Sequence, residues 1–313
     1  MEKSNSKRRV FAVVGPTAVG KTALAIELAR HLNGEIISCD SMQIYQGMDI
    51  GTAKATKEDQ MAVPHHLIDI LSPEQDFSCA DYATLAREKI DEIISRGKVP
   101  IFCGGTGLYL DSVLEISSFA DTTRNDDLRR ELEAFATENG AHALHKMLNE
   151  IDPESAEQIH ENNIKRVIRA IEIFKTTGKK KSELDALSRE KESPYEAIVF
   201  FLTARDKELL YSRIESRVDQ MLDAGLVDEC RSLFDRGLLD GKSTASGAIG
   251  YKELIPYLKG EASLEECVRA LKLSTRHYAK RQLTWFKKKN YHTIYTDELC
   301  PLDEALKIIK EAQ

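Results

Sequence analysis

The feature that most constrains the fold of this chain is a complete phosphate-binding loop near the N-terminus. Residues 15–22 read Gly-Pro-Thr-Ala-Val-Gly-Lys-Thr, the Gly-x-x-x-x-Gly-Lys-Thr spacing of a P-loop. An apolar run at 10–14 precedes this loop and helical apolar spacing follows it at 23–32, which gives the required order of strand, loop and helix. Glycines in such a loop let backbone N–H groups surround phosphate oxygens at a helix N-terminus. The sequence therefore predicts a di- or triphosphate site, whether or not the phosphate belongs to a nucleotide.

Two side chains of the loop have specific expected roles. Lys21 is expected to bridge phosphate oxygens as a point charge, and the Thr22 hydroxyl is expected to ligate Mg²⁺. The diphosphate contacts are assigned to the whole loop: Gly15, Pro16, Thr17, Ala18, Val19, Gly20, Lys21 and Thr22.

The first hundred residues alternate between apolar strands and amphipathic helices. The expected strands and helices are 10–14, 21–33, 35–39, 81–96 and 99–103. Gly34 and Gly97 are placed to end the two helices. The alternation predicts a parallel sheet covered by helices, a P-loop NTPase-like α/β fold. Ligands of such sheets lie beyond the carboxyl ends of the strands, so we expect 15–22, 40–45 and 104–107 to meet in one cleft.

The rest of the chain contains a long helical stretch between two α/β parts. Residues 125–191 are charged and helical in pattern and carry no strand signal. The elements expected after them are strands at 197–202 and 292–295 and helices at 206–223, 227–235 and 264–288. We predict a P-loop catalytic core formed by 1–118 and 195–313, with an inserted α-helical domain at 119–194.

Composition limits the class of protein. The chain is 42% hydrophobic and 30% charged, which is ordinary for a globular protein, and no apolar run approaches the roughly 18 residues of a membrane span. The basic first nine residues are not followed by an apolar signal core, so we expect a cytoplasmic protein without a membrane partner. None of the six cysteines forms a Cys-x-x-Cys pair, so a zinc ribbon is not indicated. A monomer is the default expectation.

The distribution of charge points to a polyanion although the net charge is −7. One basic segment contains Arg269, Lys272, Arg276, Lys280, Arg281, Lys287, Lys288 and Lys289 and no acidic residue. A second contains Lys165, Arg166, Arg169, Lys175, Lys179, Lys180 and Lys181 against the single acid Glu172. Two such segments on an acidic chain favour a local polyanion-binding surface, with solvated helix faces as the alternative.

Polar residues at the strand ends are candidates for chemistry. Asp40 could act as a general base, hold Mg²⁺ through water or cap the following segment, and Gln43 and Tyr45 could pair with or stack on a base. Thr106 would offer a hydroxyl from a glycine-rich turn.

Two arginines and two histidines are weaker candidates. Arg213 and Arg217 are four residues apart on an expected helix, so they share a face and could clamp a diphosphate or form surface ion pairs. His65 and His66 lack a third ligand at suitable spacing, so we expect a structural or hydrogen-bonding role.

Taken together, these motifs resemble the tRNA dimethylallyltransferases, also called tRNA isopentenyltransferases, and most closely the bacterial type. The resemblance covers nearly the whole chain. The matching segments are 15–22, 40–45, 47–54, 64–69, 104–109, 163–172, 248–252, 275–276 and 280–286. A P-loop alone is weak support, but this ordered set is specific.

The resemblance implies transfer of a dimethylallyl group from dimethylallyl diphosphate to N6 of the adenosine 3′ of the anticodon in tRNA. It implies that the P-loop and Mg²⁺ hold the donor diphosphate, that Arg217 contacts phosphate, and that Thr106 hydrogen-bonds the donor near the breaking bond. It makes Asp40 the base that takes the N6 proton. Arg213 is our own addition to the diphosphate site.

The same resemblance implies contacts with the tRNA anticodon stem-loop. The implied residues are Asp40, Ser41, Met42, Gln43, Arg129, Lys165, Arg166, Val167, Ile168, Arg169, Gly247, Ala248, Ile249, Gly250, Tyr251, Lys252, Lys280 and Arg281. Anticodon loops are read as splayed single strands, and the basic helix would add salt-dependent contacts to the backbone.

Three other functions share parts of this pattern. A small-metabolite kinase would use the P-loop and a strand-end aspartate with ATP. A prenyltransferase acting on free adenine nucleotides would need no tRNA contacts. A nucleotide-gated RNA-binding protein would perform no transfer at all.

Overall fold

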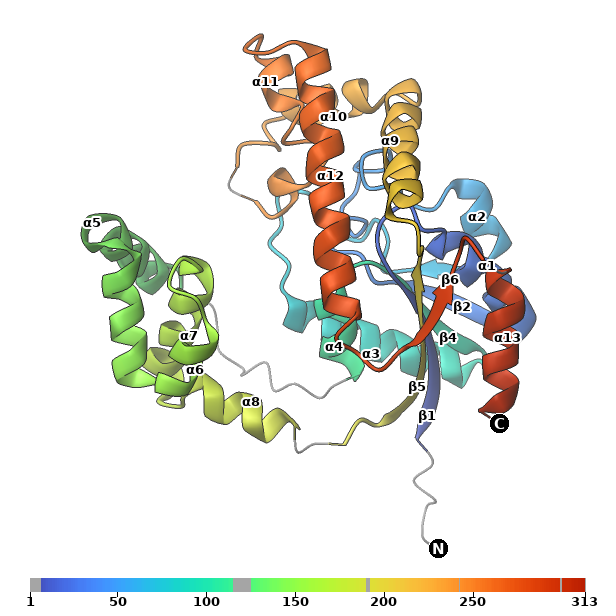
Figure 1. Cartoon of the computed structure of the whole chain (residues 1–313), viewed down its shortest axis with the longest axis horizontal. Helices are drawn as coiled ribbons and strands as arrows, with labels where there is room; N and C mark the ends of the chain where they lie inside the picture. Colours follow the sequence, from blue (N-terminus) through green and yellow to red (C-terminus); the bar gives the residue numbers. More distant parts are fainter. Residues whose placement is uncertain (1–6, 115–124, 190–191, 242, 299, 313) are drawn as a thin grey trace, which may run out of the picture. The chain divides into compact units, whose positions relative to one another are not determined.

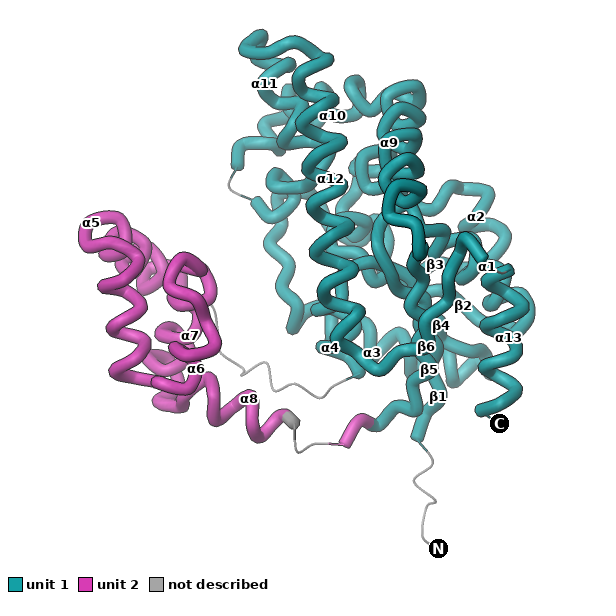
Figure 2. Tube along the Cα trace, viewed as in Figure 1, with its two compact units in different colours: residues 1–114, 194–313 teal, residues 115–193 magenta. Residues whose placement is uncertain are grey.

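The chain folds into two compact units, which Figure 2 distinguishes by colour. The structure is a computed structural model, and it describes residues 7–114, 125–189, 192–241, 243–298 and 300–312. Unit 1 is formed by Met1–Leu114 and Pro194–Gln313, and unit 2 by Glu115–Ser193. The predicted boundary between 118 and 119 lies outside the described residues.

Unit 1 is built on a six-stranded sheet in the order β3-β2-β4-β1-β5-β6, in which every neighbouring pair is parallel (Figure 1). The strands are β1 (Arg8–Val14), β2 (Gly34–Ser38), β3 (His65–His66), β4 (Val99–Gly104), β5 (Tyr195–Thr203) and β6 (His292–Tyr295). The sheet and its covering helices confirm the predicted α/β class. The two-residue strand β3 was not predicted, because its pattern is too short to detect.

Helices cover both faces of this sheet, as apolar strands on both sides require. The helices of unit 1 are α1 (Lys21–Leu32), α2 (Lys57–Ala62), α3 (Cys79–Ser95), α4 (Gly107–Leu114), α9 (Lys207–Asp223), α10 (Leu226–Asp235), α11 (Ile255–Leu258), α12 (Leu264–Phe286) and α13 (Pro301–Glu311), with a 3₁₀ turn at Ala245–Gly247. Tyr82, Ile90 and Leu110 of α3 and α4 pack on one face, and Leu24 and Ile309 of α1 and α13 pack on the other. Each fully buried apolar side chain contributes about 1.5–3 kcal/mol.

A third apolar cluster lies beyond the carboxyl ends of the strands, where α9–α12 gather (Figure 1). The helix α12 begins with a capping box in which Ser263 and Glu266 satisfy each other's backbone N–H groups. Cys267 and Leu271 of α12 are buried beside Leu226 and Leu233 of α10 in this cluster. This packing holds α9, α10 and α12 around the end of the sheet.

The end of α1 differs from the prediction. Asn33 takes the left-handed conformation that ends the helix, with φ of 51°, whereas Gly34 is already the first residue of β2. Asparagine tolerates this conformation better than most residues. Glycine is needed at 34 for another reason, because a Cβ atom there would lie 2.7 Å from the carbonyl oxygen of Val99. The prediction that Gly34 ends the helix is therefore wrong.

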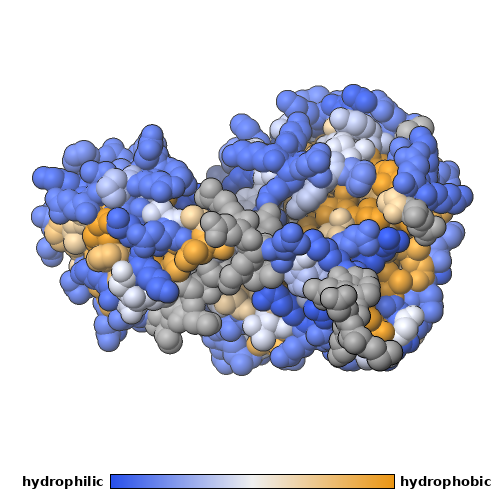
Figure 3. All heavy atoms as spheres, turned by 90° about the horizontal axis from the view of Figure 1, so that it is seen from below, coloured by the Kyte–Doolittle hydropathy of each residue, from blue (hydrophilic) through white to orange (hydrophobic). Residues whose placement is uncertain are grey.

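All the regular secondary structure in the described residues of unit 2 is helical. It contains α5 (Asp126–Ile151), α6 (Pro153–Gln158), α7 (Ile164–Thr177) and α8 (Lys181–Arg189). Leu132, Leu144 and Leu148 of α5 pack against Val167 and Ile171 of α7 in its core. Hydrophilic residues cover most of the surface shown in Figure 3. Among the described residues, no helix has the length and apolar character that crossing a membrane requires.

Candidate active site

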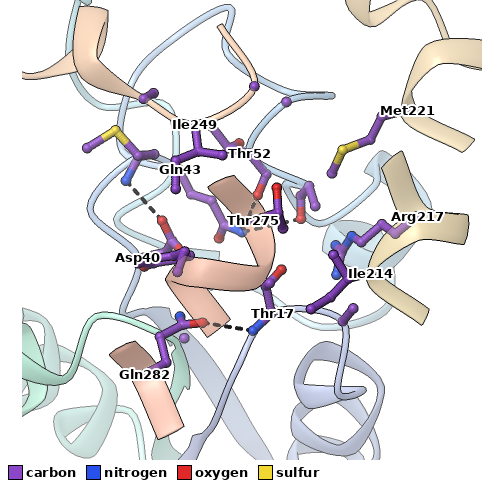
Figure 4. A pocket seen from close by; sticks show the side chains of 18 of the residues that line it. Thr17, Asp40, Gln43, Thr52, Ile214, Arg217, Met221, Ile249, Thr275 and Gln282 are labelled. Carbon is purple, nitrogen blue, oxygen red and sulfur yellow. Dashed lines mark hydrogen bonds between the residues drawn. The ribbon is translucent and has the colours of Figure 1, made fainter. Parts of the chain in front are cut away.

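A pocket of about 410 Å³ opens at the carboxyl ends of the strands, within unit 1. Its lining combines the P-loop, the segment after β2, part of the 51–53 loop, α9, the 247–252 segment and α12 (Figure 4). The functional residues that line it include Thr17, Ala18, Gly20, Lys21, Thr22, Asp40, Ser41, Met42, Gln43, Arg217, Gly247, Ala248, Ile249, Gly250, Lys252 and Arg281. Segments far apart in the sequence thus contribute to one cavity.

Lys21 of the P-loop places a positive charge in the pocket. The Nζ of Lys21 donates to the carbonyl oxygen of Pro16 at 2.7 Å. Burial lowers the pKa of Lys21 to about 8 and nearby Arg217 acts in the same direction, although Cys103 and Asp40 oppose this shift. An incoming anion would therefore find a partly desolvated ammonium group.

Three predicted phosphate contacts of the P-loop do not line the pocket. Gly15 and Pro16 precede the lining part of the loop, and the side chain of Val19 is 2% exposed and packs in the core under α1. Pro16 acts through its carbonyl oxygen, which holds Lys21. The lining part of the loop is therefore narrower than the predicted 15–22.

Asp40 follows β2 and enters the pocket opposite Arg217 (Figure 4). One carboxylate oxygen accepts the backbone N–H of Met42 at 3.0 Å, so Asp40 also organises the turn after the strand. Burial raises the pKa of Asp40, while the Met42 hydrogen bond and the positive charges of Lys21 and Arg217 act in the opposite direction. A carboxylate whose charge is costly in the folded protein is suited to accept a proton.

The predicted pairing of Arg213 with Arg217 needs correction. Arg217 lines the pocket, and burial lowers its pKa while Asp40 opposes the shift. Arg213 instead donates to the Oγ1 of Thr296 at 2.9 Å and lines a second hollow together with the P-loop residues Ala18, Val19 and Gly20. Residues four apart lie about one helical turn from each other along the helix axis. Arg213 therefore reaches the segment after β6, whereas Arg217 reaches the pocket.

Thr106 lies next to the pocket but is not among its lining residues. Its Oγ1 accepts the backbone N–H of Ser41 at 3.1 Å and donates to the Ser41 hydroxyl over a long 3.4 Å. Tyr278 of α12 also hydrogen-bonds Thr106. The structure therefore links the turn after β4 to the segment after β2.

Two residues of α12 that reach into the site were not predicted from the sequence. The Oε1 of Gln282 accepts the backbone N–H of Thr17 at 2.9 Å (Figure 4). The Nε2 of Gln282 donates to the carbonyl oxygen of Gly105 at 3.0 Å. Tyr278 lines the pocket one turn before Gln282. Helical periodicity could indicate an inward position for both residues, but nothing in the sequence pattern identifies their partners.

Gln43 and Tyr45 differ in their access to the pocket. The Nε2 of Gln43 donates to the carbonyl oxygens of Thr52 and Ala53 at 3.2 and 3.3 Å, and its Oε1 accepts the Ser38 hydroxyl at 3.0 Å. Tyr45 is 1% exposed, so the prediction that it stacks on a base is wrong.

The residues of the 247–252 segment also differ in their access to the pocket. Gly247, Ala248, Ile249, Gly250 and Lys252 line the pocket. Tyr251 is fully buried and donates its hydroxyl to Glu229 at 2.6 Å. The Tyr251 side chain therefore does not face the pocket, and the tRNA contact expected of this residue stays a prediction.

The basic face of α12 is partly neutralised. Lys272 pairs with Asp219 at 2.6 Å and Arg276 pairs with Glu215, both on α9. In contrast, Lys280 and Arg281 are exposed and form no ion pair within the part of the chain that the structure describes. The cationic groups that remain for a polyanion are fewer than the sequence count indicates.

In unit 2 as well, some basic residues are paired with an acid and others are exposed. Arg129 and Arg169 bind the fully buried Glu172 at 2.8 and 2.7 Å. Burial acts to raise the pKa of Glu172, but these hydrogen bonds outweigh it and lower the pKa to about 2. Lys165 and Arg166 at the start of α7 are exposed.

Val167 and Ile168 face the interior of unit 2. Their side chains are 0% and 3% exposed and belong to its apolar core. The side chains of these two residues therefore support the helix from inside, and the tRNA contacts expected of Val167 and Ile168 stay predictions.

The histidine pair has a structural environment. His66 lies 2.6 Å from Glu35, which also pairs with Arg96 at 2.6 Å. This agrees with the expected hydrogen-bonding role. Among the described residues, no group of three or more His, Cys, Asp or Glu side chains could hold a metal ion.

Comparison with known proteins identifies the family. The sequence model of the IPP transferase family matches residues 43–289, and that of the isopentenyl transferase family matches residues 8–75. A tRNA dimethylallyltransferase of Halalkalibacterium halodurans is 51% identical over 90% of this chain and 89% of its own length.

Solved structures agree with this comparison. A crystal structure of the tRNA isopentenylpyrophosphate transferase from Bacillus halodurans has a TM-score of 0.71 and 47% identity, covering 97% of this chain and 95% of that one. A eukaryotic dimethylallyltransferase acting on tRNA has a TM-score of 0.84 and 28% identity, covering 97% and 79%. The chain therefore belongs to the IPP transferase family, together with the curated tRNA dimethylallyltransferases.

Proposed function

We propose that this protein transfers a dimethylallyl group from dimethylallyl diphosphate to N6 of the adenosine 3′ of the anticodon in tRNA, with release of diphosphate. One observation carries the proposal: the P-loop Lys21, the base candidate Asp40 and Arg217 converge in one pocket. The same pocket has an apolar wall on α9, formed by Ile214, Val218 and Met221. A phosphate-binding end beside an apolar wall suits a prenyl diphosphate.

Lys21 and Arg217 would stabilise the leaving diphosphate. Both cations lie in a partly desolvated site, where a charge developing on the leaving group interacts more strongly than in water. The carbon–oxygen bond of the donor breaks as the bond to N6 forms, and the electron pair leaves with the diphosphate. The Thr106 hydroxyl donates only over a long 3.4 Å to the Ser41 hydroxyl, so its proton would turn to the bridging oxygen of a bound donor.

Asp40 would take the proton that N6 loses. An exocyclic adenine amine is a weak nucleophile, so positioning contributes a large part of the acceleration. The raised pKa of Asp40 favours acceptance of the proton, and its hydrogen bond from Met42 fixes the carboxylate.

The residues present fit a magnesium ion held together with the donor. Mg²⁺ keeps several waters and commonly uses one or two protein oxygens plus substrate phosphates, and the Thr22 hydroxyl and the Asp40 carboxylate supply such oxygens in the pocket. The ion would neutralise charge on the diphosphate.

The tRNA contacts would come from exposed groups of both units. Lys280 and Arg281 of α12 and Lys165 and Arg166 of α7 are exposed. They would bind the backbone of the anticodon stem-loop while the target base, unstacked, enters the pocket. Gln43 would then meet the base with the free acceptor capacity of its Oε1.

A single assay tests the proposal. The protein is incubated with dimethylallyl diphosphate, Mg²⁺ and unmodified tRNA, and the nucleosides are analysed by mass spectrometry. We expect a five-carbon gain on adenosine next to the anticodon. No gain on any suitable tRNA with folded protein would reject the proposal, and a gain on free AMP alone would favour the nucleotide-prenylating alternative. Phosphorylation of a small metabolite from ATP would favour the kinase.

A further inference from the structure

One carboxylate that lies outside the pocket accepts backbone hydrogen bonds from a loop that lines the pocket. Glu229 of α10 accepts the N–H groups of Asp49, Ile50 and Gly51 at 2.9–3.1 Å. Its Oε1 also accepts the Tyr251 hydroxyl at 2.6 Å. Three consecutive N–H groups directed at one carboxylate form an anion-binding concavity, and here the anion belongs to the protein itself.

The loop and the Tyr251 segment are also packed at backbone distance. A Cβ atom at position 51 would lie 2.6 Å from the ring of Tyr251, so only glycine fits this approach. Tyr251 is fully buried, and burial raises its pKa with the nearby Glu229 charge acting in the same direction. The phenol therefore stays protonated and remains a donor to the carboxylate.

The position of this loop determines how the side chain of Gln43, a residue of the pocket, is oriented. After Gly51, the carbonyl oxygens of Thr52 and Ala53 accept both N–H groups of Gln43. An amide nitrogen has only two donors, so the orientation of Gln43 depends on where these two carbonyls lie. The acceptor oxygen of Gln43 keeps one lone pair beyond the Ser38 contact.

Glu229 itself does not line the pocket, whereas Gly51, Thr52, Ala53 and Gln43 do. We propose that Glu229 and Tyr251 are positioning residues that hold the Gly51–Ala53 wall and, through it, the Gln43 amide that meets the acceptor base. The acceptor part of this inference rests on the proposed function. The diphosphate end, formed by Lys21 and Thr22, lies on a different element and should be independent of the pair.

The test compares Glu229→Gln with Asp228→Asn, a neighbouring exposed carboxylate in the same turn of α10. In Glu229→Gln, the new amide group would point its own N–H donors at N–H or O–H groups, so backbone amides 49–51 should exchange with solvent at least about ten-fold faster. Asp228→Asn should leave their exchange unchanged. Equal exchange in both variants would overturn the proposal, and this measurement requires no substrate.

Kinetics of the same variants separate positioning from general destabilisation. In Glu229→Gln, KM for tRNA should rise about ten-fold while KM for dimethylallyl diphosphate changes by less than about two-fold. Tyr251→Phe keeps the ring against Gly51 and removes one hydrogen bond, so it should show a smaller shift in the same direction. An equal rise in both KM values would overturn the proposal. If the wild-type protein transfers no prenyl group, the proposed function fails, and the exchange measurement still decides the role of Glu229.

Discussion

The Oε1 of Gln282 accepts the backbone N–H of Thr17 at 2.9 Å, which joins the basic helix α12 directly to the P-loop. Its Nε2 donates to Gly105 at 3.0 Å, so one buried amide also fixes the turn after β4. The helix that carries Lys280 and Arg281 therefore shapes the phosphate cradle as well.

Replacing Gln282 by Glu should weaken donor binding. The carboxylate keeps an acceptor for Thr17 but loses the donor to Gly105, and it places a negative charge near the diphosphate site. We expect the Kd for dimethylallyl diphosphate, measured by calorimetry, to rise at least about ten-fold, because the added negative charge repels the diphosphate in a partly desolvated site. Gln220→Glu, at an exposed position of α9, is the control and should bind normally. Normal binding by Gln282→Glu would contradict this account.

Asp40→Asn should abolish transfer and yet stabilise the fold at neutral pH. Because the folded protein raises the pKa of Asp40, stability falls as pH rises from the unfolded value of about 3.9 to the folded pKa, and stays lower above it. The neutral amide removes this cost, so Tm should increase at pH 7 and match the wild type below about pH 3.9.

Two measurements check the Asp40 prediction. Single-turnover assays should give no prenylated tRNA from the variant, while calorimetry should still detect dimethylallyl diphosphate binding. Turnover near the wild-type level would remove Asp40 from the role of base. A lower Tm at pH 7 would mean that its attraction to Lys21 and Arg217 exceeds its burial cost.

Sequence patterns predicted those pocket residues that lie in the segments after β1 and β2. Lys21, Thr22 and Asp40 belong to segments whose place at the end of a parallel sheet is fixed by the alternation of strands and helices. Gln282 and Glu229 were missed because their partners are far away in the chain. Gln282 contacts Thr17 across 265 positions, and Glu229 contacts Asp49 across 180. A single sequence contains no signal for such pairings.

Motif resemblance also does not reveal which side chain of a motif faces outward. Tyr251, Val167 and Ile168 lie within matching motifs, yet all three are buried. Each of them packs in the interior of its own unit. The number of basic residues on α12 also overstates the cations that are available to a polyanion. Lys272 and Arg276 are paired with acids of α9, a different segment of the chain.

Two double variants of α12 should therefore behave differently. Lys280→Ala with Arg281→Ala removes two exposed cations, so tRNA affinity should fall and the slope of log K against log salt should flatten by about 1–2 units. Lys272→Ala with Arg276→Ala removes paired cations and should leave the slope nearly unchanged. Filter binding of the anticodon stem-loop over a range of salt concentrations measures both. Equal slopes in the two double variants would contradict the distinction between the paired and the exposed cations of α12.

Glu172→Gln should destabilise unit 2 by about 3–5 kcal/mol, because it leaves Arg129 and Arg169 around a buried neutral group. The folded protein lowers the pKa of Glu172 to about 2, so this stabilisation is present above about pH 4.3 and is lost as pH falls towards 2. Urea unfolding followed by hydrogen exchange in 125–189 measures it. The exposed Glu133→Gln on α5 is the control, and equal stability of the two variants would contradict a structural role for Glu172.

Donor binding should take up a proton through Lys21 when the pH is above about 8. Burial lowers the pKa of the free Lys21 ammonium to about 8, and a bound diphosphate must raise it again, because a nearby negative charge favours the charged form. Affinity for dimethylallyl diphosphate should therefore decrease as pH rises beyond about 8. Calorimetry at about pH 8.5 in buffers of different ionisation enthalpy measures the proton uptake, and Lys21→Arg is the control because arginine stays protonated at this pH. Proton uptake by the Lys21→Arg variant equal to that of the wild type would assign the effect to another group.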